Sequence, residues 1–554
     1  MPKKRRSNMQ EPTSAPSAPS SISKYWDWAL VAAVILFVAA IRIRLLQTPL
    51  ERDEGEFGYM GQLMLQGIPP YKLAYNMKFP GIYAAYALVL GIFGQTIAAV
   101  HIGLMIVNSI SIVLIFLIGK RLFDRLTGVV AAATFAILSV HPAVLGTSAH
   151  ATQYAAPFAL GGILLLLKAI ESGKTMPVFW SGMLLGISLL MKQHAALFIP
   201  FACLYYIWSL MGKRPIAWSR LGSGVGMLLV GSVIPFGAAC LWLYTAGVFA
   251  NFWFWTFTYA HQYVSQLPVS KGIIMLRVVG GDIARSYIWL LGIAAAGIAA
   301  ISWDKKARAN SAFLLGFLAF SFLTTCPGMF FRSHYFVLML PAIGLLAGVA
   351  VSATVNLLLE WKSPRAVQAI PIAVFLLAAL VTVYAQRVIF FQATPVTACR
   401  MRYGLNPFPE SVGVAKYIKD HSSKDDVVAV LGSEPEIYFY SQRHSATGFI
   451  YVYGLMEPQI YASKMQQDMI REIESSKPKF IVFTNVRTSW LARPESDMSI
   501  VRWAARYATD HYRLVGVVDM ASAADCRAYW GKDAAKYTPT ASDNVFVFER
   551  KARQ

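Results

Sequence analysis

Residues 97–119 read IAAVHIGLMIVNSISIVLIFLIG, a run without a single Asp, Glu, Lys or Arg. A helix needs about 20 mostly apolar residues to cross the hydrocarbon core of a membrane. Similar runs recur along this chain of 554 residues, which is 56% hydrophobic and only 14% charged. Soluble domains carry roughly 25% charged residues. The sequence therefore predicts a polytopic α-helical membrane protein.

We expect about eleven membrane-spanning helices from runs of this kind. Their expected ranges are 25–46, 97–119, 126–146, 153–171, 176–191, 195–211, 221–245, 285–302, 311–325, 334–356 and 367–391. The apolar stretch 80–94 is too short to span comfortably. It is predicted to be a juxtamembrane or partly inserted helix on the outer face.

Basic residues gather in the short loops between these helices. Clusters occur at 3–6, 120–125, 213–220, 305–308 and 362–365. With eleven spans they all fall on one side, which the positive-inside rule makes cytoplasmic. The net charge of +21 is thus explained by topology, and no nucleic-acid partner is expected. We predict a multi-pass protein of the inner (plasma) membrane with a cytoplasmic N-terminus.

The chain divides into three predicted parts. Residues 1–24 are basic and then rich in Pro, Ser and Ala, which is typical of a disordered cytoplasmic tail. Residues 25–391 form the membrane domain, with a catalytic first outer loop at 47–96. Residues 392–554 contain short strands at 427–432, 479–484, 512–518 and 544–548 that alternate with helices, and this predicts an extracytoplasmic α/β domain. Whether Cys399 and Cys526 pair there is left open.

Two classes of function fit a chain of this kind. A transporter or flippase for a lipid-linked or anionic solute should carry ionisable residues inside its helices. The predicted spans contain almost no Asp or Glu. Acids and isolated cations lie in the outer loops instead, which favours an enzyme that works at the outer membrane surface.

The first outer loop, TPLERDEGEFGYMGQLMLQGIPPYKLAYNMKFPG (48–81), collects four carboxylates within six residues, at positions 51, 53, 54 and 56. A carboxylate can act as general base on a hydroxyl. The outer cations Arg52, Lys78, Lys192 and Arg332 suit a lipid phosphate or pyrophosphate. Together they indicate transfer of a group from a lipid phosphate carrier to a hydroxyl, with the cations stabilising the leaving phosphate.

Four motifs carry a family resemblance: the Arg-Asp-Glu at 52–54, NMKFPG (76–81), MKQH (191–194) and FRSHYFVLMLP (331–341). In this order they resemble the GT-C membrane glycosyltransferases of glycosyltransferase family 39, the protein O-mannosyltransferase and aminoarabinose transferase group. The resemblance implies a sugar donor on a polyprenyl phosphate, transfer outside the cytoplasm with inversion, and no cofactor. It covers roughly residues 25–391.

The resemblance also implies roles for single residues. Asp53 would be the catalytic base, and Glu54 would orient the acceptor or the sugar. Lys78 would bind the donor phosphate, although its Pro lies one residue later than the family pattern has it, at Pro80. The remaining substrate-binding residues implied by the resemblance would be Lys192, Arg332, His334 and Tyr335. Arg52 is predicted to bind substrate from its position alone. Where relatives often have an acid, this chain has Gln153, which cannot act as a base.

Several points stay open in the sequence. His150, His194 and His334 could form a metal site, but no spacing is diagnostic, and we expect none while not excluding a divalent metal. The aromatic stretch 251–266 is interpreted as an interfacial helix, with a pocket wall as the alternative. The polar-aromatic stretch 431–451 could hold an acceptor. The sugar, hexosyl or pentosyl, and the acceptor, whether lipid, glycan or protein, are not determined.

Overall fold

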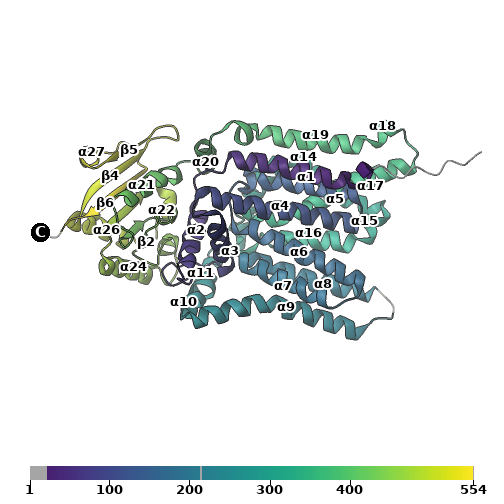
Figure 1. Ribbon diagram of the computed structural model, residues 1–554, viewed down its shortest axis with the longest axis horizontal. Coiled ribbons are helices and arrows are strands. Elements are labelled where there is room, and N and C mark those ends of the chain that lie inside the picture. Colours follow the sequence, from purple (N-terminus) through teal and green to yellow (C-terminus); the bar gives the residue numbers. More distant parts are fainter. Residues whose placement is uncertain (1–20, 213–214, 553–554) are drawn as a thin grey trace, which may run out of the picture.

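The computed structural model describes residues 21–212 and 215–552. Most of the predicted tail, up to residue 20, lies outside the described residues. Figure 1 shows a bundle of long, roughly parallel helices with a smaller α/β part at one of its ends. The short helices α2 (Arg52–Leu65) and α3 (Pro80–Phe93) lie between the two parts.

The bundle is built from long apolar helices. They are α1 (Ser21–Arg44), α4 (Ile97–Leu122), α5 (Arg125–Val140), α6 (Ala151–Ser172), α7 (Met176–Met191), α8 (Phe198–Met211), α9 (Trp218–Thr245), α14 (Ile288–Ala299), α16 (Ser311–Leu323), α17 (Leu340–Glu360) and α19 (Ile370–Ala385). Among the described residues, seven helical stretches are long and apolar enough to cross a membrane, and a pair bent by 95° (Val269–Ser286 and Ile288–Ser302) would make eight. The protein is a multi-pass membrane protein; the count of eleven spans stays a prediction.

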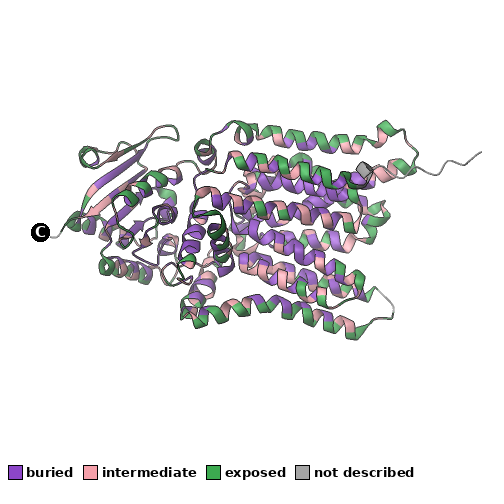
Figure 2. Ribbon diagram, viewed as in Figure 1, coloured by how far each residue is buried: buried purple, intermediate pink, exposed green. Residues whose placement is uncertain are grey.

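The outside of the bundle is apolar, as a surface that faces lipid must be. Leu36, Leu377 and Leu380 expose 69%, 62% and 64% of their surface. Figure 2 shows exposed residues along the outer faces of the peripheral helices and buried residues within the bundle. The most enclosed span is Ser333–Glu360, in which 94% of the apolar 18-residue window is buried.

Basic loops meet at the end of the bundle that lies away from the sheet, where α15 (Lys305–Ala309) and α18 (Arg365–Gln368) are found (Figure 1). Lys306 Nζ donates to the carbonyl of Phe123 at 3.3 Å, which joins two of these loops. Nearby, the buried Asp27 pairs with Lys120 at 2.7 Å. This distribution is the one expected if that end faces the cytoplasm.

A mixed six-stranded sheet forms the core of the C-terminal part. Its strands are β1 (Val427–Leu431), β2 (His444–Ser445), β3 (Phe480–Asn485), β4 (Tyr512–Met520), β5 (Cys526–Trp530) and β6 (Asn544–Arg550). The order is β2-β1-β3-β6-β4-β5, with β1 parallel to β2 and β3 and the other pairs antiparallel. The predicted α/β domain is confirmed, although the sequence predicted neither β2 nor β5.

Helices cover this sheet and connect it to the bundle. They are α20 (Pro395–Tyr403), α21 (Phe408–Asp420), α22 (Glu436–Ser441), α23 (Tyr453–Met456), α24 (Ala462–Ser476), α25 (Arg487–Trp490), α26 (Ser499–His511) and α27 (Lys532–Lys536). The thiols of Cys399 and Cys526 are both free in the structure.

One expected helix is too long. The range 126–146 was predicted as a single span, but α5 ends at Val140. His141 Nδ1 accepts a hydrogen bond from the backbone N–H of Ala143 and Pro142 follows, so the chain turns into a short 3₁₀ segment, Pro142–Val144. Proline restricts the residue before it and so ends the preceding helix. The turn leads toward the outer loop that contains His150.

Helix α2 has a face of glycines against its neighbours. A Cβ atom on Gly55 would lie 2.5 Å from the backbone nitrogen of Glu436 in α22, and one on Gly58 would lie 2.9 Å from the ring of Phe439. On Gly61 it would lie 3.0 Å from the backbone of α3. These contacts are too close for any side chain, so the glycines let α2 pack directly against both parts of the molecule.

Candidate functional site

A cavity of about 910 Å³ lies between the C-terminal domain and the end of the bundle that faces it. The start of α2, the segment 75–78, the residues after α7, the loop 327–335 and the segment 451–457 of the C-terminal domain all line it. Its described lining includes all but one of the predicted site residues. The exception is Glu54.

Asp53 lies in the first turn of α2, which begins with a capping box between Glu51 and Glu54. Its Oδ1 accepts hydrogen bonds from Lys78 Nζ at 2.9 Å and from the Tyr451 hydroxyl at 3.2 Å. Burial by itself would raise the pKa of Asp53, but the Lys78 ammonium holds it well below its usual range. Asp53 is therefore an anion in the cavity.

Lys78 pairs with two carboxylates. Besides Asp53, its Nζ contacts Glu56 Oε2 at 2.5 Å, and Tyr83 donates to the other oxygen of Glu56 at 2.8 Å. Burial would lower the pKa of Lys78, but the two carboxylates raise it above its ordinary value. The segment 48–81 thus supplies these carboxylates and also their counter-ion, Lys78. Asp53 and Lys78, both predicted as site residues in this segment, are in direct contact.

Two further cations line the same cavity. Lys192 caps the C-terminus of α7 and lies 5.0 Å from the centre of the Tyr335 ring, while Arg332 lies over Phe330. Burial and the neighbouring charge of Lys78 lower the pKa of Lys192 to about 8. Among the described residues no carboxylate pairs with Lys192 or Arg332, in contrast to Lys78. Both are available to an anionic ligand.

Glu54 faces away from the cavity. Its Oε1 accepts from the backbone N–H of Ala149 at 2.6 Å, and Oε2 accepts from the N–H of Glu51 at 3.1 Å. His101 Nε2 lies 3.2 Å from Oε1. Through these contacts Glu54 stabilises the start of α2 and connects it to the segment before α6. A direct part in catalysis stays a prediction.

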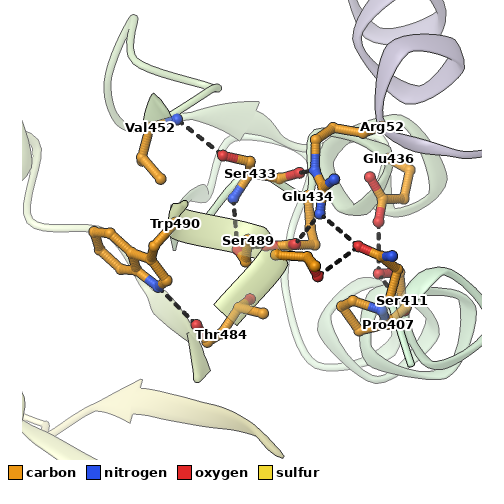
Figure 3. A network of polar contacts seen from close by, with 12 residues as sticks. Arg52, Pro407, Ser411, Ser433, Glu434, Glu436, Val452, Thr484, Ser489 and Trp490 are labelled. Carbon is orange, nitrogen blue, oxygen red and sulfur yellow. Dashed lines mark hydrogen bonds and ion pairs between the residues drawn. The ribbon is translucent and has the colours of Figure 1, made fainter. Parts of the chain in front are cut away.

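The side chain of Arg52 reaches into the C-terminal domain (Figure 3). Its Nε donates to the carbonyl of Ser433, and its Nη2 lies 3.2 Å from Glu434 Oε1. Ser489 donates to the other oxygen of the fully buried Glu434 at 2.7 Å. These partners lie at the carboxyl ends of β1 and β3, the edge where parallel sheets commonly bind ligands. Here a side chain of the membrane domain occupies that edge, and a role for Arg52 in substrate binding stays a prediction.

Asp53, His150 and His334 form the group of described residues whose ligand atoms come within 4.8 Å of one another, as a metal site would require. His194 is not part of this group; its Nδ1 is hydrogen-bonded to the Thr324 carbonyl at 2.8 Å. The rings of His150 and His334 stack face to face at 4.2 Å and 11°. An imidazole binds a metal through the lone pair in its ring plane, and two parallel planes do not converge on one ion. The rings as arranged do not fit a metal.

Tyr451, which contacts Asp53, is among the cavity residues that sequence reasoning did not single out. It belongs to the stretch 431–451, for which an acceptor role was considered only by analogy of fold. The aromatic stretch 251–266 was interpreted as an interfacial helix, but Trp255, Tyr259 and Tyr263 line the cavity. The alternative of a pocket wall describes them better. In the sequence, these residues were marked only by the high density of aromatic residues in 251–266, and such a density does not distinguish a pocket from a membrane interface.

Comparison with known proteins places this geometry in context. Residues 78–236 match the family model described as dolichyl-phosphate-mannose-protein mannosyltransferase. No curated protein sequence matches the chain. The structure is similar to that of ArnT from Cupriavidus metallidurans bound to undecaprenyl phosphate, with a TM-score of 0.58, 15% identity, and coverage of 96% of this chain and 98% of that one.

Two other solved structures share the architecture. The oligosaccharyltransferase of Archaeoglobus fulgidus in the apo form matches with a TM-score of 0.55 and 13% identity, over 94% of this chain and 76% of that one. The arabinofuranosyltransferase AftD from Mycobacteria matches with a TM-score of 0.51 and 14% identity, over 96% and 40%. The predicted GT-C membrane fold is thereby confirmed. At these identities the similarity establishes the fold alone.

Proposed function

We propose that this protein is a glycosyltransferase that moves a sugar from a polyprenyl-phosphate donor to a hydroxyl of an envelope acceptor, at the outer face of the inner membrane. One observation carries the proposal: a single cavity at the end of the bundle contains the Asp53 carboxylate together with Lys78, Lys192 and Arg332. A base and a group of cations are what transfer from a phosphate leaving group requires. The similar ArnT structure contains undecaprenyl phosphate, a lipid of the proposed donor class.

In the proposed reaction Asp53 removes the proton of the acceptor hydroxyl. The acceptor oxygen attacks the anomeric carbon while the bond from that carbon to the phosphate oxygen breaks. The electron pair of that bond passes to the phosphate, where Lys78, Lys192 and Arg332 stabilise the added charge. A single displacement inverts the anomeric configuration.

Donor binding would also strengthen the base. Without donor, Lys78 is paired with Asp53 and depresses its pKa, which makes the carboxylate a weak base. A phosphate that draws Lys78 away removes part of this stabilisation, so the pKa of Asp53 rises toward the working pH. The base would thus become effective when the donor is in place.

The proposed function is tested by supplying the purified protein with synthetic polyprenyl-phosphate sugars and an envelope fraction. We expect release of polyprenyl phosphate and a labelled acceptor. Mass spectrometry of envelope glycans from a deletion strain would identify the missing sugar and so name donor and acceptor. If the protein in liposomes instead moves the lipid across the bilayer without consuming it, the transporter alternative is correct.

Lys192 gives the reaction a predicted alkaline limit. Its pKa of about 8 means that the phosphate-binding ammonium form is present below that pH and is lost above it. We expect kcat/KM for the donor to fall about tenfold per pH unit above roughly pH 8. Lys192→Arg stays charged and should move this fall to higher pH. A pH profile that is identical in the two proteins would contradict the role of Lys192.

We propose that no metal takes part in transfer, since the two imidazoles near Asp53 stack in parallel. Prolonged dialysis against EDTA should leave the transfer rate within about twofold of the untreated protein, because cations of the chain stabilise the leaving phosphate. A loss of activity that Mn²⁺, Mg²⁺ or Zn²⁺ restores would show that the rings rotate to bind an ion.

A further inference from the structure

The C-terminal domain lines the cavity with Tyr403, Asn406 and Phe408 and with one further short segment, Tyr451–Glu457. From this segment Tyr451 contacts Asp53, while the ring of Tyr453 lies against Arg52. The two tyrosine rings pack edge to face with their centres 4.9 Å apart. The hydroxyl of Tyr451 is 3.2 Å from Asp53 Oδ1, whereas that of Tyr453 donates to the carbonyl of Thr488 at 2.7 Å. Two adjacent tyrosines therefore differ in whether they contact the proposed base.

The two oxygens of Asp53 have different surroundings. Oδ1 accepts from Lys78 and from Tyr451. Oδ2 lies 3.6 Å from His150 Nδ1, beyond hydrogen-bonding distance, and neither ring nitrogen of His150 has a hydrogen-bond partner among the described residues. Oδ1 is thus occupied, and Oδ2 is the oxygen left to receive a proton.

The Tyr451 hydroxyl can act only as donor in this contact. Burial and the nearby charge of Asp53 raise the pKa of Tyr451 well above its usual range, so the phenol keeps its proton. Its ring also lies 5.5 Å from Lys78 Nζ. The same side chain therefore touches both members of the Asp53–Lys78 pair.

A closed ring of contacts holds Tyr451 in place. Arg52 donates to the carbonyl of Ser433, and Ser433 Oγ accepts from the backbone N–H of Val452 at 3.1 Å (Figure 3). Val452 follows Tyr451, which returns to Asp53, the neighbour of Arg52. Two consecutive residues of α2 are thus bound to two consecutive residues of the C-terminal domain, Asp53 to Tyr451 directly and Arg52 to Val452 through Ser433. Such a two-point attachment fixes distance and orientation together.

We propose that Tyr451 is a positioning residue for the base: its hydroxyl holds Oδ1 of Asp53 so that Oδ2 faces the acceptor hydroxyl in the cavity. This inference rests on the proposed function and deepens it, because it gives the C-terminal domain a defined part in catalysis. The acceptor then binds between that domain and the membrane helices.

The test is the variant Tyr451→Phe, which removes one oxygen and keeps the ring. Small misplacements of a catalytic group cost up to about 100-fold in rate, so we expect kcat to fall about 10- to 100-fold while KM for the donor stays within about twofold. Tyr453→Phe is the matched control, because it removes a hydroxyl that donates to Thr488 and not to Asp53. It should keep kcat within about twofold of the wild type.

A double variant separates positioning from a structural effect. Once Asp53→Asn has removed the base, adding Tyr451→Phe should lower the remaining rate no further, since residues that act as a unit are not additive. Full additivity overturns the inference, as does a wild-type kcat in Tyr451→Phe or an equal loss in Tyr453→Phe. If the wild-type protein transfers no sugar at all, the proposed function fails, and this inference fails with it.

Discussion

Asp53→Asn is expected to lower kcat by about 10³-fold, within the range that removal of a general base produces. Asparagine has nearly the shape of aspartate, and its amide oxygen can still accept from Lys78 and Tyr451. It cannot take a proton from the acceptor. The loss should therefore fall on the chemical step and leave the packing of α2 intact.

The effect on donor binding distinguishes this explanation from misfolding. Without the charge of Asp53, Lys78 keeps only Glu56 as its partner and is freer to bind phosphate. KM for the donor should stay unchanged or decrease, as measured with purified protein and a synthetic donor. Asp420→Asn, which removes an exposed carboxylate in an i,i+4 pair with Lys416, is the control for loss of charge. A kcat above about a tenth of the wild-type value in Asp53→Asn would contradict a base mechanism.

Lys78→Met is expected to have the second largest effect, with kcat/KM for the donor lowered by about 10²- to 10³-fold, as removal of a buried transition-state contact does. It also leaves Asp53 and the fully buried Glu56 without their cation. Breaking a buried ion pair by removing one partner costs about 3–5 kcal/mol of stability. Activity and stability should therefore both fall.

A second substitution separates the two losses. In Lys78→Met/Glu56→Gln the fully buried acid is neutral, so the thermal midpoint should recover in part, because a neutral side chain costs less to bury. Asp53 still lacks its cation in this variant. Transfer should not recover, because the phosphate still lacks its cation. Recovery of both would show that Lys78 is only a structural counter-ion. Lys78→Arg keeps a charge but changes its geometry, and an intermediate rate is expected.

Much of the fold follows from local pattern. Apolar runs predicted the membrane helices, and buried runs at 427–432 and 479–484 predicted β1 and β3. The edge strands β2 and β5 were missed because β2 has two residues and β5 is only partly buried, so neither forms an apolar run. The end of α5 was missed because proline is tolerated inside membrane helices, so Pro142 alone does not predict a helix end, and the cap that His141 forms there depends on the turn.

The site was predictable where its residues share one loop. Asp53 and Lys78 are 25 positions apart and in direct contact, and they belong to two of the four motifs whose order carried the resemblance. Glu54 could not be distinguished from Asp53 in the sequence, because only the fold shows that one faces the cavity and the other faces His101. Tyr451 lies 398 positions from Asp53. No local rule connects them.

That separation has a consequence for how the protein is made. A chain is synthesised from its N-terminus, and domains fold as they emerge. The segment with Asp53 and Lys78 is among the first to be synthesised. Ser433 and Tyr451, which bind Arg52 and Asp53 of that segment, follow the last long apolar helix of the bundle, α19. A chain that stops before residue 451 carries the proposed base and cations without the hydroxyl that orients them. In the proposed mechanism the unfinished protein would be a poor catalyst, and the C-terminal domain, which is synthesised last, would decide when the donor is first consumed.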